Sequence, residues 1–95
     1  MSEESIIVTF HTTHAALKAD RWFRDNAPPV EIIPTPRPIS SECGFTLLCR
    51  NRAADEICAL LHEHKLTYEA VYREMRSGRE VIYETINKEE KETGS

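Results

Sequence analysis

The residues best suited to chemistry lie in a long loop that ends at a single thiol, Cys43. Prolines stiffen the approach to this thiol, because each fixes its own φ near about −65°; they are Pro34, Pro36 and Pro38. Small residues surround the thiol, namely Ser40, Ser41 and Gly44. Long connections in small domains are uncommon and tend to be functional. The pattern therefore predicts a presented, reactive cysteine, and the plain alternative is a surface turn with an incidental cysteine.

Activation of this thiol would need a stabilised thiolate, which is the reactive form of cysteine. Positive charge or a helix N-terminus nearby supplies that stabilisation. Arg37 stands six residues before Cys43 and is the candidate cation, although it could equally be a solvated loop charge. Ser40 and Ser41 can donate hydrogen bonds to the sulfur. Gly44 lets backbone amides approach the sulfur.

The other two cysteines fall on apolar faces. Cys49 alternates with Phe45 and Leu47, which is typical of a buried strand face. Cys58 lies on the inward stripe of an expected helix, where cysteine behaves as a small hydrophobe. Because the chain has three cysteines, an odd number, we expect no disulfide framework.

Histidines offer a metal site as a rival hypothesis. His11 and His14 are three residues apart at an expected strand–helix junction and could join Cys43 as ligands. A fourth ligand would come from His64, Glu42 or water. Zinc accepts such nitrogen and sulfur ligands, but the chain lacks paired Cys-x-x-Cys spacing. His11 and His14 could also merely cap and pack, and we predict neither a metal nor a cofactor.

The composition is that of an ordinary globular protein, with 40% hydrophobic and 29% charged residues. A net charge of −4 argues against a nucleic-acid surface. The chain has no apolar run near the roughly 18 residues that a membrane helix needs, and its acidic start, Met1–Glu4, is unlike a signal peptide. We expect a cytoplasmic protein without nucleic-acid or membrane partners.

Hydrophobic periodicity predicts an alternation of strands and helices. Thr12 or Thr13 can cap the first helix and Asn51 the second. The expected strands are Ser5–Phe10, Val30–Ile33, Phe45–Cys49 and Tyr68–Met75, and the expected helices are Thr13–Asn26 and Arg52–Lys65.

This order, β-α-β-β-α-β, is the ferredoxin-like pattern, an α+β two-layer sandwich with an antiparallel sheet and both helices on one face. Glu80–Ile86 is expected to add a fifth strand, with a short helix as the competing interpretation. We expect one domain over residues 1–87 and a flexible charged tail over residues 88–95, because Asn87–Ser95 has no apolar anchor.

The topology predicts which residues share an edge of the sheet. In this fold the end of strand 1, the start of helix 1, the strand 2–3 loop and the start of strand 4 lie at one edge. The residues expected at or near it are His11, His14, Arg37, Cys43, His62, His64 and Tyr68.

Three segments resemble a known family: Thr9–Ala19, Ile33–Arg37 and Ile39–Gly44. The match extends from about Ile6 to Tyr72 and is to the small bacterial and archaeal domains described as selenium/sulfur carrier protein-like. Its specific part is Pro-Arg-x-Ile-Ser-Ser-x-Cys-Gly. Two residues depart from the family's pattern. Pro38 replaces a commonly acidic residue, and Glu42 replaces a common serine and adds a negative charge that opposes thiolate formation.

The resemblance implies a carrier that holds sulfur or selenium on Cys43 as a persulfide or selenosulfide, with donor and acceptor proteins as partners. The chain has no phosphate-binding glycine loop and no nucleophile elbow, which favours a carrier or binding protein over a self-sufficient enzyme. A regulatory or interaction domain is the third hypothesis. Ferredoxin-like sheets often bind small ligands or pair edge to edge, and a homodimer would fit either reading.

Overall fold

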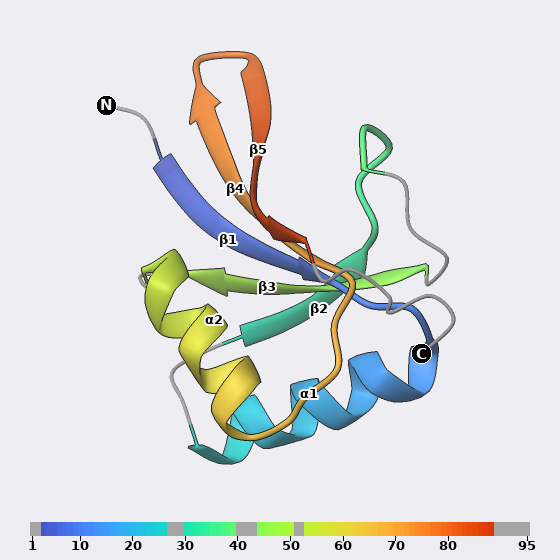
Figure 1. The fold of residues 1–95 in the computed structure, drawn as a ribbon. Coiled ribbons are helices and arrows are strands. Elements are labelled where there is room, and N and C mark those ends of the chain that lie inside the picture. The colour runs from blue at the N-terminus through green and yellow to red at the C-terminus, as the bar shows by residue number, and fades with distance from the viewer. Residues whose placement is uncertain (1–2, 27–29, 40–43, 51–52, 89–95) are drawn as a thin grey trace.

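The computed structural model describes residues 3–26, 30–39, 44–50 and 53–88. These residues form two helices and a five-stranded antiparallel sheet with the strand order β2-β3-β1-β4-β5 (Figure 1). In chain order the elements are β1 (Glu3–Thr9), α1 (Thr13–Asn26), β2 (Val30–Pro34), β3 (Phe45–Arg50), α2 (Ala54–Glu63), β4 (Ala70–Ser77) and β5 (Glu80–Lys88). The predicted ferredoxin-like architecture with a fifth strand is therefore confirmed. The competing helix at residues 80–86 was wrong, because they pair with β4.

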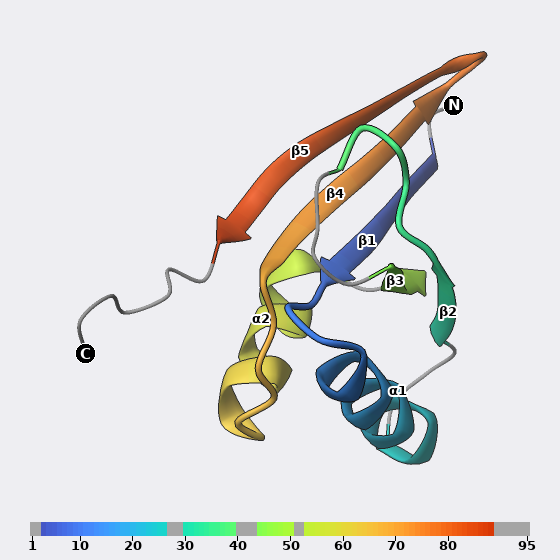
Figure 2. The same ribbon diagram turned by 90° about the vertical axis from the view of Figure 1, so that its right-hand side faces the viewer.

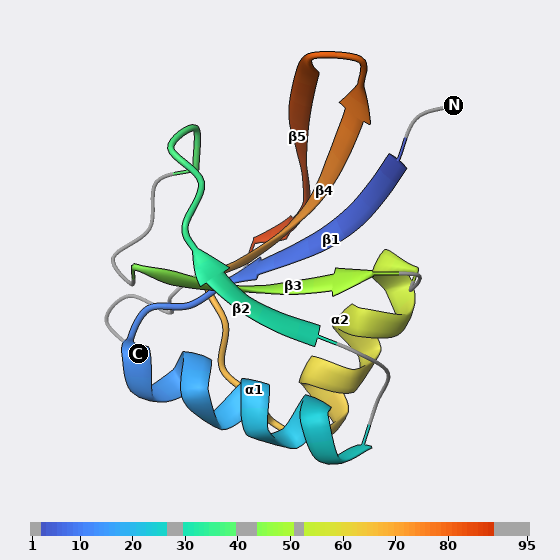
Figure 3. The same ribbon diagram turned by 180° about the vertical axis from the view of Figure 1, so that it is seen from behind.

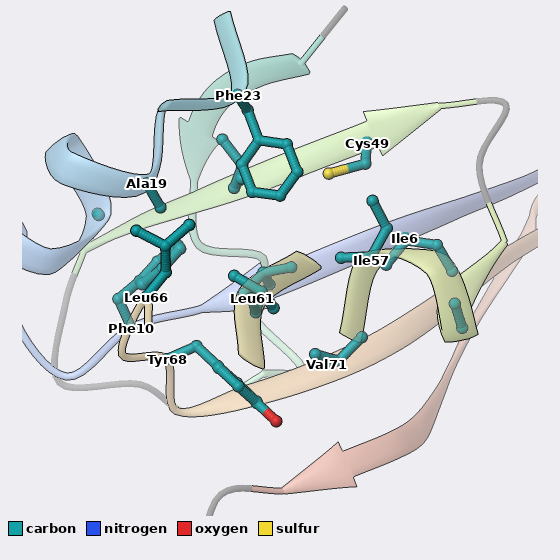
Figure 4. Close-up of a cluster of buried hydrophobic side chains, with 14 residues drawn as sticks. Ile6, Phe10, Ala19, Phe23, Cys49, Ile57, Leu61, Leu66, Tyr68 and Val71 are labelled. Carbon is teal, nitrogen blue, oxygen red and sulfur yellow. The ribbon is translucent and has the colours of Figure 1, made fainter. Parts of the chain in front are cut away.

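Both helices cover the same face of the sheet, as Figures 1 and 3 show. Alternate residues of β1, Ile6 and Val8, are buried against the helical layer together with Phe23 of α1 and Leu61 of α2 (Figure 4). Phe10 follows β1 and is fully buried in the same cluster. This cluster is the main core. Neither helix in the described part of the chain is long and apolar enough to cross a membrane.

The helix α1 begins where its sequence predicts. The hydroxyl of Thr12 accepts a hydrogen bond from the backbone N–H of Ala15 at 3.1 Å, and the Thr12 carbonyl accepts one from Ala16 at 3.1 Å. These are the bonds of a threonine N-cap. Ala16 and Ala19 are completely buried, so small side chains let the helix lie close to the sheet.

The helix α2 is shorter than the predicted Arg52–Lys65. Its N-cap is Ala53, which makes no side-chain capping bond, and the expected cap Asn51 lies outside the described residues. At the other end the Leu66 N–H donates to the Leu61 carbonyl at 2.9 Å, and the Lys65 N–H donates to the His62 carbonyl at 3.2 Å. These two bonds form a Schellman motif, which stops the helix by turning the chain at Lys65.

Lys65 has a φ of 54°, in the left-handed region that glycine favours. A lysine there has a steric cost of roughly 1–2 kcal/mol. The turn that ends the helix therefore requires a left-handed backbone conformation at a residue, Lys65, that is strained by it.

The opposite face of the sheet carries a second, smaller apolar cluster. Its buried members are Ile7 of β1, Leu48 of β3 and Ile39 from the loop between β2 and β3. Ile39 is only 6% exposed. The described part of the loop therefore folds back over the face away from the helices, as Figure 2 shows.

The strand β5 continues beyond the expected domain boundary. Asn87 and Lys88 pair with Val71 and Ala70 of β4, so both residues belong to the sheet and not to a tail. The Asn87 amide also donates a hydrogen bond to the Tyr68 hydroxyl at 2.6 Å. The expected strand ended at Ile86 because Asn87 and Lys88 are polar, but backbone pairing and this side-chain bond extend an edge strand whose Tyr83 and Ile86 pack against the two apolar clusters.

Replacing Ile39 by alanine is expected to lower the free energy of unfolding by about 2 kcal/mol, because a buried isoleucine would leave a cavity over Ile7 and Leu48. Ile82→Ala is the matched control, since Ile82 is 53% exposed and its loss should cost at most about 1 kcal/mol. Urea denaturation of both variants measures the difference. Equal destabilisation would show that the loop is not anchored by this contact.

Replacing Lys65 by glycine is expected to stabilise the protein. Relief of roughly 1–2 kcal/mol of backbone strain is partly offset by the greater freedom of glycine in the unfolded chain, about 0.4–1 kcal/mol. Thermal denaturation should show a higher midpoint for Lys65→Gly than for wild type. Lys65→Ala keeps the strained backbone and removes only the side chain, so its midpoint should not rise. A higher thermal midpoint in both variants would show that loss of the lysine side chain, and not relief of backbone strain, stabilises the protein.

Candidate functional site

One edge of the sheet brings together the strand ends at which sequence analysis expected a site. Thr9 at the end of β1 pairs with Thr46 near the start of β3 and with Ala70 at the start of β4. The carboxyl end of β1 and the amino ends of β3 and β4 therefore meet at this edge. His11 follows Thr9 directly and is half-buried, and Arg37 is exposed in the loop between β2 and β3.

Cys43 itself lies outside the described residues, as do Ser40, Ser41 and Glu42. The arrangement of Ser40 and Ser41 about the thiol therefore stays a prediction, as does the proximity of Arg37 and His11 to it. What the structure does describe is the chain on both sides of this segment.

Both ends of that segment are held on the sheet. On one side Ile39 is buried, and its N–H donates to the Pro36 carbonyl at 3.0 Å, which closes a turn. On the other side the Gly44 carbonyl accepts a bond from the Thr35 N–H at 3.0 Å. The Thr35 hydroxyl is also hydrogen-bonded to the hydroxyl of Thr46 at 2.9 Å. The four residues from Ser40 to Cys43 thus connect two fixed points.

Gly44 is not required by packing against the described residues. An added Cβ at Gly44 would meet none of their atoms within 4 Å. The expectation that Gly44 lets backbone amides approach the Cys43 sulfur therefore stays a prediction.

The two described cysteines are unsuited to exchange with a partner. Cys49 is 1% exposed in the core beneath the helices, as predicted (Figure 4). Cys58 is half-buried, not fully buried as expected from its place on the inward stripe of α2. Burial raises the pKa of the Cys58 thiol and the Asp55 carboxylate raises it further, while a hydrogen bond with Asn87 lowers it. Cys58 is therefore mainly a neutral thiol near pH 7.

The histidines do not gather around one point in the described part of the chain. His64 packs against Trp22 of α1 with the two rings tilted by 36° and their centroids 4.2 Å apart. His62 lines a hollow with Tyr68, and His14 lines another with Lys18 and Arg21. No group of three or more possible ligands is present among the residues that the structure describes. The metal hypothesis draws no support from them.

Sequence reasoning missed a buried carboxylate on the sheet face away from the helices. Glu74 is 7% exposed and accepts a hydrogen bond from the Tyr83 hydroxyl at 2.9 Å. Burial and this bond raise the pKa of Tyr83, so its hydroxyl keeps its proton well into alkaline conditions. The sequence shows two adjacent strands joined by a short turn, but only the hairpin register places Tyr83 directly opposite Glu74 on the same sheet face.

Comparison with protein families gives one match. The family described as Putative Se/S carrier protein-like matches residues 5–73. The match includes β1 through most of β4 and therefore both helices and the loop with Cys43. No curated protein and no solved structure matches the chain.

In a Cys43→Ser background, iodoacetamide should alkylate Cys58 slowly at neutral pH and Cys49 hardly at all until the protein unfolds. The rate at Cys58 should rise only at a pH above the ordinary range of cysteine, because its pKa is raised. Asp55→Asn removes a negative charge that opposes the thiolate, so it should accelerate alkylation of Cys58.

Glu56→Gln is the matched control, since Glu56 also lies in the first turn of α2 but is not among the groups that shift the pKa of Cys58. Peptide mapping by mass spectrometry across a pH series gives both rates. Rapid labelling of Cys49 in the folded protein would contradict its burial.

Proposed function

Because the chain belongs to the Se/S carrier protein-like family, we propose that it carries sulfur or selenium as a persulfide or selenosulfide on Cys43. The observation that carries this proposal is the placement of the other thiols. Cys49 is enclosed in the core and Cys58 has a raised pKa. A carrier needs a thiolate that a donor and an acceptor can both reach, and the placement of Cys49 and Cys58 supports Cys43 in that role.

The transfer of sulfur is a thiol exchange that needs no external oxidant or reductant. The Cys43 thiolate attacks the outer sulfur of a donor persulfide, a new S–S bond forms, and the donor thiolate leaves. In the return step an acceptor thiolate attacks the same outer sulfur and Cys43 leaves as a thiolate. For selenium, hydrogen selenide anion attacks the Cys43 sulfur of the persulfide and displaces hydrosulfide, which gives the selenosulfide.

The anchored ends of the loop support this chemistry. Both partners must approach the same sulfur atom, so the segment that bears it should be accessible yet confined. Burial of Ile39 and the bond between Thr35 and Gly44 confine its two ends. Confinement lowers the entropy that is lost when a partner binds the loop.

Arg37, Ser40, Ser41, Gly44, His11 and His14 have supporting roles in the proposal. Arg37 lies in the turn that Pro36 and Ile39 close and is exposed, so it can contribute positive charge near the loop. Ser40, Ser41 and the amide side of Gly44 would donate hydrogen bonds to the thiolate. His11 and His14 flank the start of α1, whose N-terminus favours negative charge.

The test is the intact mass of the protein after incubation with a cysteine desulfurase and cysteine. Wild type should gain the mass of one sulfur atom, and a reductant should remove it. Cys43→Ser should gain none. Cys58→Ser is the matched control, because it removes a thiol of the same chain and should accept sulfur as wild type does.

A second probe, sodium tetrasulfide, tests the thiol without a protein donor, since the Cys43 thiolate can take one sulfur and release the shorter polysulfide. Stable addition of sulfur to the Cys43→Ser variant would end the carrier proposal in this form. Loading of wild type with selenide after persulfide formation would extend it to selenium.

A further inference from the structure

Two hollows lie along α1, and a third adjoins them at the end of α2. One is lined by His14, Leu17, Lys18 and Arg21, and the next shares Lys18 and Arg21 and adds Trp22 and Leu66. The third shares Leu66 and lies beside Lys65, in the connection between α2 and β4 that runs past α1 (Figure 1). We call this continuous surface the α1 groove and define it by Leu17, Lys18, Arg21, Trp22, Lys65 and Leu66.

The cations of the α1 groove have no acidic partners within the described residues. Elsewhere most described arginines are paired: Arg24 with Asp20, Arg50 with Glu31, Arg73 with Glu84 and Arg76 with Glu74. Lys18, Arg21 and Lys65 make no ion pair in that part of the chain. Asp25 is the one acidic residue that lines the hollows. In a chain of net charge −4, this is a local concentration of uncompensated positive charge.

One of these cations is kept at a structural cost. Lys65 is the only described residue other than glycine with a positive φ, although glycine would fit that position without strain. Strained positions persist where the surrounding structure requires them, and they gather at functional sites. Glycine would relieve the strain but would remove the Lys65 ammonium from the rim of the α1 groove. A binding role for this positive charge therefore explains why lysine occupies the position.

The floor of the α1 groove is apolar. Leu17 is 55% exposed. The Trp22 ring is held edge-on by Phe23 at 5.1 Å and is covered by the His64 ring at 4.2 Å. With the tilted His64 ring packed against it, Trp22 is poorly placed as a stacking platform for a nucleic-acid base. An apolar floor with a cationic rim instead suits a protein segment that carries both carboxylates and an apolar side chain.

We propose that the α1 groove is a docking site for an acidic, amphipathic segment of a partner protein. Carboxylates of that segment pair with Lys18, Arg21 and Lys65, and one of its apolar side chains covers the exposed Leu17. We assign the partner as the protein that delivers sulfur, and this assignment rests on the proposed function of Cys43. The existence of the docking surface does not depend on that function.

The first experiment uses the fluorescence of Trp22, which is the only tryptophan and lines the groove. The probe is a peptide in which glutamate alternates with leucine. Wild type should show a saturable change in emission that weakens at high salt. Lys18→Glu/Arg21→Glu should bind the peptide at least roughly tenfold more weakly. Arg79→Glu reverses an exposed cation at the β4–β5 turn, away from the groove, and should bind as wild type.

Lys65→Gly separates a binding role from a structural one. It should bind the peptide more weakly than wild type although its thermal midpoint is higher, and Lys65→Ala should show the same weakening without the higher midpoint. Undiminished binding by either variant would remove Lys65 from the site.

Three kinds of outcome overturn the docking site. One is binding that does not depend on the groove's cations, seen as unchanged peptide binding by Lys18→Glu/Arg21→Glu or as an equal loss in Arg79→Glu. Another is tighter binding of single-stranded oligouridylate than of the peptide, which would assign the groove to nucleic acid. The third is a change in Trp22 emission when residues 89–95 are removed without any peptide present, which would assign it to the chain's own acidic end.

The second experiment measures sulfur delivery by a cysteine desulfurase as a function of carrier concentration. Lys18→Glu/Arg21→Glu should raise KM at least roughly tenfold and leave kcat unchanged, while loading of Cys43 by tetrasulfide stays as in wild type. An unchanged KM would exclude the α1 groove from donor docking. Failure of wild type to accept sulfur from either source would instead refute the carrier function, and the peptide experiment would still decide the docking site.

Discussion

The strand β1 has to bury side chains on both of its faces, and the other elements are arranged to meet that constraint. Ile6 and Val8 face the helices, while Ile7 faces the opposite side and is completely buried. The two helices cover the first face. On the second face, Ile39 from the loop between β2 and β3 packs with Ile7. The loop that leads to Cys43 is therefore part of the core through Ile39.

Most of the architecture could be predicted because it is encoded locally. The alternation around Ile7, the alanines that face inward on α1 and the hydroxyl of Thr12 each indicate a strand, a helix face or a cap from neighbouring residues alone. The end of α2 could not be read in this way. A lysine gives no signal for a left-handed turn, so periodicity continued the helix through Lys65.

For the candidate site too, residue types can be read from the sequence, whereas contacts between distant parts of the chain cannot. Chemistry at Cys43 is a hypothesis from residue types, because prolines, serines and a lone thiol are visible in the sequence. Burial of Ile39 could not, since it depends on contact with Ile7 and Leu48, which are distant in the chain. The α1 groove was equally hidden. Lys18 and Arg21 share one helix face, but Lys65 and Leu66 join them only through the tertiary fold.

The position of β1 at the centre of the sheet also sets an order of events during synthesis on the ribosome. β1 is made first, yet its neighbours β3 and β4 follow more than 35 and 60 residues later. Such distant pairing delays folding, because long loops must close before contacts form. The other two buried members of the cluster around Ile39, Ile7 and Leu48, are however made before β4, whereas Tyr72 and Tyr83 pack against it later. The hairpin of β2 and β3 can thus settle on β1, with Ile39 against Ile7 and Leu48, while the last two strands are still being translated.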